Sequence, residues 1–148
     1  TDRFPTGHVG IMATQVTLRE EKLEHLVGRF PDAKVERIPA PGLVELVEQD
    51  KVDTPETEAL LRNILTPYIG QLDAIVLGCT HYPFAANVIS RLLPGTVLLD
   101  GGEGTARETK RRLELSGLLY EGTGEILWQN SADNDEILSL CRSLLDLR

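Results

Sequence analysis

The chain alternates short apolar runs with longer segments whose apolar residues recur at helical spacing. This alternation is typical of α/β proteins in which helices cover a largely parallel sheet. The apolar runs predict five strands, at His8–Ala13, Lys34–Ile38, Ala74–Leu77, Thr96–Leu99 and Glu125–Gln129. The helical patterns predict helices at Leu18–Phe30, at Gly42–Gln49, from Thr54-Pro55-Glu56 onward, and at Phe84–Leu93, Gly104–Gly117 and Asp133–Asp146. The fold class predicted from the pattern is therefore α/β.

Composition and charge narrow the class of protein. The 148 residues fit one typical domain, and 41% hydrophobic with 26% charged residues is ordinary for a globular protein. The net charge of −8 argues against a nucleic-acid partner, because the densest basic run, Lys110-Arg111-Arg112, has glutamates close by and is better interpreted as a solvated helix face. No apolar run approaches the roughly 18 residues of a membrane helix, so no membrane partner is expected.

Cysteine usage and the start of the chain add two expectations. Two cysteines do not make a disulfide framework, so the reducing cytoplasm is the expected compartment. The chain begins at Thr1 rather than at a methionine, and we therefore expect a fragment of a longer polypeptide.

Cys79 is the first candidate for chemistry. It follows the predicted buried strand Ala74–Leu77, and ligands of parallel α/β sheets bind beyond the carboxyl ends of strands. The segment Gly78-Cys79-Thr80-His81 brings a thiol, a hydroxyl and an imidazole together, and a cationic imidazole or a helix N-terminus favours the thiolate. A small core side chain and a proton carrier are both compatible with this pattern. Cys141, on the apolar face of a predicted helix, is expected to pack in a core.

Other polar residues carry weaker signals. Glu48 closes a short helical segment and resembles a solvated helix residue. Thr14 and Thr17 follow a predicted strand, where hydroxyls could bind a carboxylate or cap the next helix. The run Asp100–Ala106 lacks the glycine spacing of a dinucleotide site and is interpreted as a turn. The three histidines are scattered, with no His-Glu-x-x-His pattern and no cysteine pair, so no metal site is expected.

Leu77-Gly78-Cys79-Thr80-His81-Tyr82-Pro83 resembles the second cysteine motif of the glutamate-specific members of the aspartate/glutamate racemase family. Further segments resemble that family in the same order, namely Gly10–Thr17, Leu43–Glu48 and Val97–Gly102. The resemblance implies a three-layer α/β/α fold with a mainly parallel sheet. It also implies the cofactor-independent interconversion of L- and D-glutamate, which supplies D-glutamate for bacterial peptidoglycan and cell-wall biogenesis.

The implied mechanism uses two cysteines that face opposite sides of the substrate α-carbon. One thiolate removes the α-proton and the other thiol returns one. Cys79 would be one of these acid/bases, His81 would assist it, and Glu48 would support the same side through His81 or the substrate ammonium. The charged groups of glutamate would be held by Thr80 and His81 and by Thr14 and Thr17.

The chain departs from the family in four places. The family's Asp-Ser-Gly start and the segment with its first catalytic cysteine are absent, and the surroundings of Cys141 do not match that segment. Val16 stands where the family usually has glycine, and Gly101 stands where it has serine. The analogy therefore makes residues 1–98 the second racemase domain and residues 99–148 a segment that returns to the first. A missing N-terminal half or a homodimer partner would complete the site, and this chain alone is expected to racemise poorly.

Two alternatives stay open. The chain could be a racemase for aspartate or a related amino acid, because the residues that measure side-chain length cannot be placed. It could also be a non-catalytic α/β module that binds a carboxylate ligand or a partner protein. The absent first cysteine is the feature that favours this second alternative.

Overall fold

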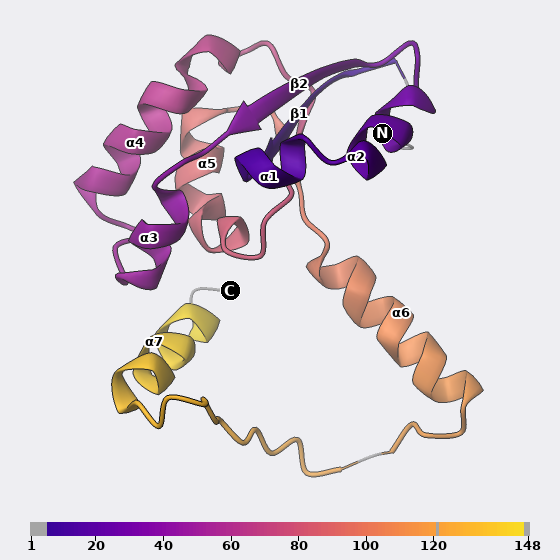
Figure 1. Cartoon of the computed structure of the whole chain (residues 1–148), viewed down its shortest axis with the longest axis vertical. Helices are drawn as coiled ribbons and strands as arrows, with labels where there is room; N and C mark the ends of the chain where they lie inside the picture. Colours follow the sequence, from indigo (N-terminus) through magenta and orange to yellow (C-terminus); the bar gives the residue numbers. More distant parts are fainter. Residues whose placement is uncertain (1–5, 121, 147–148) are drawn as a thin grey trace. The chain divides into compact units, whose positions relative to one another are not determined.

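A four-stranded parallel sheet forms the centre of the larger part of the protein (Figure 1). The structure is a computed structural model that describes residues 6–120 and 122–146. The strands lie in the order β2-β1-β3-β4, and every neighbouring pair is parallel. Their bounds are β1 His8–Ala13, β2 Lys34–Pro39, β3 Ala74–Leu77 and β4 Val97–Leu99. The predicted α/β class with a parallel sheet is confirmed.

One face of the sheet is covered by α1 (Gln15–Leu18) and α2 (Glu21–Gly28). Side chains from β1, β2 and both helices pack there, namely Ile11, Ala13, Leu18, Leu23, Val27 and Val35. The single helix predicted for Leu18–Phe30 is wrong at its start, because the chain leaves helical geometry between the two helices. Glu20 is extended, with φ −70 and ψ 134, and it forms the N-cap position of α2. This break turns the apolar side of each helix toward the sheet.

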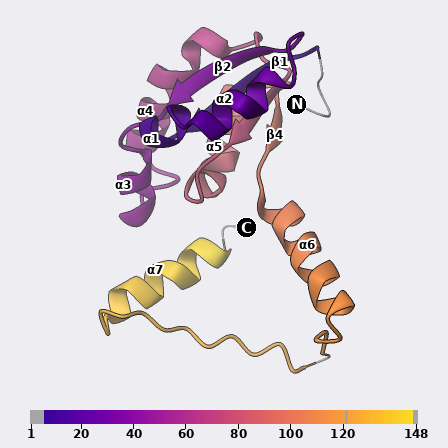
Figure 2. The ribbon, with the colours of Figure 1, turned by 45° about the vertical axis from the view of Figure 1, so that its right-hand side comes forward.

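The other face carries α3 (Leu43–Glu48), α4 (Pro55–Leu65) and α5 (Ala86–Leu92), with short 3₁₀ turns at η1 (Thr66–Tyr68) and η2 (Tyr82–Ala85). Figure 2 shows α4 and α5 on the side of the sheet opposite α2. Met12 and Ile75, which point toward this layer by strand alternation, have no exposed surface. The first unit is thus a three-layer α/β/α structure.

Helix α4 begins as its sequence predicts. Thr54 is the N-cap residue, its hydroxyl accepts the Thr57 N–H at 3.5 Å, and Pro55 occupies the first turn. Leu61 and Leu65 are fully buried on the inner side of the helix. Pro67 lies in η1, directly after the helix, as expected from its inability to continue a helical ladder.

The chain divides into two compact units, Thr1–Asp100 and Gly101–Arg148. The second unit contains α6 (Gly102–Leu115) and α7 (Asp135–Asp146). No residue of α6 is buried, and Arg111 and Arg112 both donate to Glu108, at 2.7 and 2.9 Å. These hydrogen bonds lower the pKa of Glu108 to about 2. The side chains of Lys110, Arg111 and Arg112 are 68%, 57% and 77% exposed, which confirms the interpretation of the basic run as a solvated helix face.

The strand predicted at Glu125–Gln129 is wrong. Residues 122–130 belong to no strand, and Ile126 and Leu127 are 62% and 79% exposed. A short apolar run becomes a strand only when a neighbouring strand satisfies its backbone groups, and the described part of the second unit has no strand to pair with it. Cys141, expected in a core, is only half-buried on α7. No helix among the described residues is long and apolar enough to cross a membrane.

Candidate functional site

The candidate site lies where β1 and β3 end side by side. Met12 pairs with Leu77, and the Gly78 N–H donates to the Met12 carbonyl at 2.8 Å. A Cβ atom on Gly78 would stand 3.3 Å from the Ala13 Cβ, closer than most packed side chains approach. Glycine therefore permits the two strand ends to stay together. As a result, the turns that begin at Thr14 and Cys79 leave the sheet at the same edge.

Cys79, His81 and Glu48 form a chain of polar contacts at this edge. His81 Nε2 lies 3.1 Å from Glu48 Oε1, and His81 Nδ1 lies 3.9 Å from the Cys79 Sγ. A carboxylate can only accept, so Nε2 carries the hydrogen in this contact and Nδ1 of the neutral ring is the acceptor. The Cys79 thiol can therefore pass its proton to Nδ1, while Glu48 stabilises the imidazolium that forms. This arrangement has the order of a nucleophile–base–orienter chain.

Solvent reaches the side chains of this cluster. The side chains of His81 and Glu48 are 32% and 61% exposed, and Cys79 is half-buried. Thr80, which is exposed, places its hydroxyl 3.4 Å from the same Nδ1 atom as the thiol. Because Glu48 and His81 are 33 residues apart, their contact depends on the fold that joins α3 to the turn after β3.

The two threonines of the β1 turn are also paired. Thr14 Oγ1 accepts the Thr17 N–H at 3.3 Å and caps α1, and its hydroxyl donates to Thr17 Oγ1 at 3.1 Å. Of the two roles expected for these hydroxyls, carboxylate binding or helix capping, Thr14 therefore has the capping role. The Thr17 hydroxyl accepts in this pair, so its own hydrogen is available to another acceptor. Within the described residues, no hydrogen bond joins these threonines to the Cys79 cluster.

Tyr82 is a buried neighbour that sequence reasoning did not single out. Its side chain has no exposed surface, and its hydroxyl donates to the Ala40 carbonyl at 3.3 Å. Burial raises the pKa of Tyr82 to about 12, and the nearby Cys79 and Glu45 charges add to the rise. The hydroxyl is therefore neutral near pH 7. Its place directly after His81, within an apolar stretch, was the available signal.

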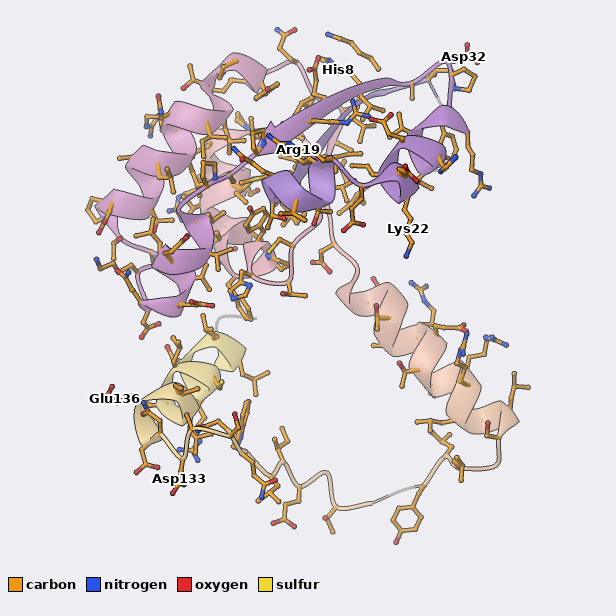
Figure 3. The ribbon with its side chains drawn as sticks, in the orientation of Figure 1. His8, Arg19, Lys22, Asp32, Asp133 and Glu136 are labelled. Atoms are coloured by element: carbon orange, nitrogen blue, oxygen red, sulfur yellow. The ribbon has the colours of Figure 1, made fainter. Side chains whose placement is uncertain are left out.

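A second cluster of polar side chains contains His8, at the other end of β1 (Figure 3), together with Glu36 and Lys34. His8 Nε2 is 3.2 Å from Glu36 Oε1, and Lys34 Nζ is 3.2 Å from the same oxygen. Hydrogen bonds from Lys34 and His8 lower the pKa of the Glu36 carboxyl. These groups tie β1 to β2 at the amino edge of the sheet, away from Cys79. Among the described residues, no group of three His, Cys, Asp or Glu side chains could hold a metal ion.

The comparisons of this chain with known proteins agree on one family. Residues 3–109 match the family model described as Asp/Glu/Hydantoin racemase. A glutamate racemase of Clostridium perfringens is 38% identical over 148 residues, which cover 97% of this chain and 57% of that protein. A glutamate racemase of Clostridium acetobutylicum is 39% identical over 145 residues. The chain spans little more than half the length of these curated relatives.

Solved structures support the same fold. Glutamate racemase from Thermus thermophilus, in complex with β-chloro-D-alanine, has a TM-score of 0.71 and 33% identity over 90% of this chain and 52% of that one. Glutamate racemase from Francisella tularensis, in complex with D-glutamate, has a TM-score of 0.74 at 21% identity, a likeness of fold alone.

Proposed function

This chain belongs to the Asp/Glu/hydantoin racemase family, and we propose that it forms one half of a glutamate racemase site in which Cys79 is one of two proton carriers. The observation that supports this most directly is the Cys79–His81–Glu48 chain of contacts at the carboxyl edge of the sheet. The similarity to glutamate racemases suggests glutamate as the substrate. In a cell, the reaction would take place in the cytoplasm and supply D-glutamate for peptidoglycan.

The chemistry explains why a thiol would need these neighbours. The α-proton of an amino acid is very weakly acidic, so its removal requires a strong base close to the α-carbon and a site that stabilises the carbanionic state. In the proposed mechanism the Cys79 thiol gives its proton to His81 Nδ1, and the resulting thiolate takes the α-proton. Glu48, 3.1 Å from Nε2, holds the ring and balances its charge. No cofactor takes part in this proton transfer.

Substrate binding is assigned to the hydroxyls around the thiol. Thr80 and His81 would contact one charged group of glutamate beside Cys79. In the β1 turn, Thr17 has a hydroxyl hydrogen available to a carboxylate oxygen, whereas the Thr14 hydrogen is directed to Thr17. Thr14 would therefore orient Thr17 and cap α1 at the same time.

The opposite face of the α-carbon needs a second acid. In the proposal, residues 1–98 act as the second racemase domain, residues 99–148 as the segment that returns to the first domain, and the second thiol comes from that first domain or from a homodimer partner. Tyr82 cannot substitute for it, because burial raises the pKa of Tyr82 to about 12 and its proton is directed to the Ala40 carbonyl.

Exchange of the α-proton in D₂O tests the proposal. L- and D-glutamate are incubated separately with the chain, with Cys79→Ala and with Cys141→Ala, and deuterium at the α-carbon is followed by NMR. We expect exchange without inversion in one enantiomer only, lost in Cys79→Ala and retained in Cys141→Ala. Equal exchange in Cys79→Ala, or none in the unaltered chain, contradicts a working half site. Aspartate in a parallel reaction measures substrate preference.

A further inference from the structure

We propose that Tyr82 is a positioning residue that holds the turn carrying Cys79 and His81 against the segment carrying Glu48. The inference deepens the proposed function and rests on it for its meaning in catalysis. Tyr82 itself would not touch the substrate. Its hydroxyl would act through the Ala40 carbonyl, on the geometry of the His81–Glu48 contact.

The hydrogen bond of Tyr82 joins two loops that leave different strands. Tyr82 begins η2, which follows β3, and its hydroxyl donates to the carbonyl of Ala40, which follows β2. The Leu43 N–H, at the start of α3, donates to the same carbonyl at 3.4 Å. Ala40 is 3% exposed, so this junction is shielded from water. One carbonyl thus links η2 to the first residue of the helix that ends at Glu48.

The contact between His81 and Glu48 needs such a link. Both side chains are partly open to solvent, and pairs of this kind add too little stability to order two separate elements. Tyr82, by contrast, is the largest fully buried side chain of the protein's described residues, and α3 packs against η2 around it. The buried junction therefore determines where Glu48 meets His81, rather than the reverse.

The backbone of the turn links the position of Tyr82 directly to the positions of Cys79 and His81. The Tyr82 N–H donates to the Cys79 carbonyl at 3.2 Å, so Tyr82 belongs to the same turn as the thiol. His81 immediately precedes it in the chain. A small movement of Tyr82 would therefore displace His81 Nε2 relative to Glu48 and His81 Nδ1 relative to Cys79.

A double-mutant cycle on thiol reactivity tests this inference without any need for racemisation. The rate of Cys79 alkylation by iodoacetamide is measured at pH 7.5 for Tyr82→Phe, Glu48→Gln and the double variant, all in a Cys141→Ala background. We expect Tyr82→Phe to slow alkylation by no more than Glu48→Gln does, about 1.4- to 5-fold. In the Glu48→Gln background, Tyr82→Phe should have almost no further effect, because the contact it positions is already lost. Fully additive effects, or an unchanged rate in Tyr82→Phe, overturn the proposal.

A spectroscopic readout separates positioning from general destabilisation. The nuclear Overhauser effect (NOE) between the His81 ring and the Glu48 side chain should weaken in Tyr82→Phe and remain unchanged in the matched control Tyr68→Phe, at a half-buried tyrosine of η1. An unweakened NOE in Tyr82→Phe overturns the proposal.

The unaltered chain supplies a test that requires no variant of Tyr82 to fold. In the unaltered chain, the hydroxyl proton of Tyr82 should exchange with water more slowly than the hydroxyl proton of Tyr68. Equally fast exchange of the two protons overturns the proposal. A failure of α-proton exchange alone would count against racemisation and leave the positioning result intact.

Discussion

Replacing Glu48 by glutamine should slow the alkylation of Cys79 while leaving the fold unchanged. Glutamine keeps an oxygen that can accept the hydrogen bond from His81 Nε2, which lies 3.1 Å from Glu48 Oε1, and removes only the negative charge. That charge favours the imidazolium formed when the Cys79 thiol gives up its proton. Because the thiolate is the nucleophile that attacks iodoacetamide and displaces iodide, the alkylation rate reports this proton transfer.

The expected decrease in the alkylation rate follows from the solvent exposure of the Glu48–His81 pair. With Glu48 61% exposed and His81 32% exposed, the pair belongs with surface ion pairs, which contribute about 0.2–1 kcal/mol. That range corresponds to a rate decrease of about 1.4- to 5-fold. The same charge effect should shrink in 1 M salt, where the screening length falls to about 3 Å.

The rate of Cys79 alkylation is measured from quenched time courses with iodoacetamide at pH 7.5, in a Cys141→Ala background. Glu56→Gln is the matched control, because Glu56 makes an exposed ion pair with Lys51 at 3.1 Å away from the site. The reasoning is refuted by an equal rate in Glu48→Gln and the control. A decrease beyond tenfold would also refute it, because the pair would then behave as a buried one.

Three further predictions concern the scaffold. Leu61→Ala, at a fully buried position, should lower the free energy of unfolding by about 2–5 kcal/mol in urea titrations, and a loss under 1 kcal/mol would contradict the packing of α4. Gly10→Ala should lower it by about 1–3 kcal/mol, because the new Cβ would lie 2.9 Å from two buried side-chain ends; an unchanged midpoint would contradict this. The Glu108 carboxyl should titrate in NMR near its lowered pKa of about 2 and return toward 4.5 when Arg111 and Arg112 are both changed to glutamine. Since the folded pKa is depressed, the stabilisation of α6 by Glu108 is present above pH 4.5 and lost as the pH falls toward about 2, which helicity measured by circular dichroism should follow.

The local elements of the first unit were largely predictable. β1 and β3 have the bounds expected from their apolar runs, and α4 begins at its threonine cap. Such features depend on residues that are neighbours in the chain, so periodicity and capping chemistry identify them. The pairing of Cys79 with His81 is local in the same sense, because only Thr80 separates them in the chain.

Features that depend on distant partners were not predictable in this way. The run Glu125–Gln129 has the apolar character of a strand, yet no strand in the described part of its unit pairs with it. The break at Glu20 likewise follows from packing two helical segments on one sheet face. Tyr82 stood in the cysteine motif without a role of its own, and only the fold places its hydroxyl 3.3 Å from the carbonyl of Ala40, 42 residues earlier in the chain.

The sequence by itself determined the strands of the first unit, most of the helices and the residue types available for acid/base chemistry, because these depend on spacing within a few residues. The family resemblance assigned Glu48 a supporting role, but no local pattern distinguished it from a solvated helix residue. The tertiary structure decided that Glu48 meets His81. The sheet order β2-β1-β3 brings the segments after β2 and β3 to the same edge, and the buried junction at Ala40 joins them. Contacts across 33 residues cost chain entropy that only the packed core offsets, and they therefore exist only once the fold has formed.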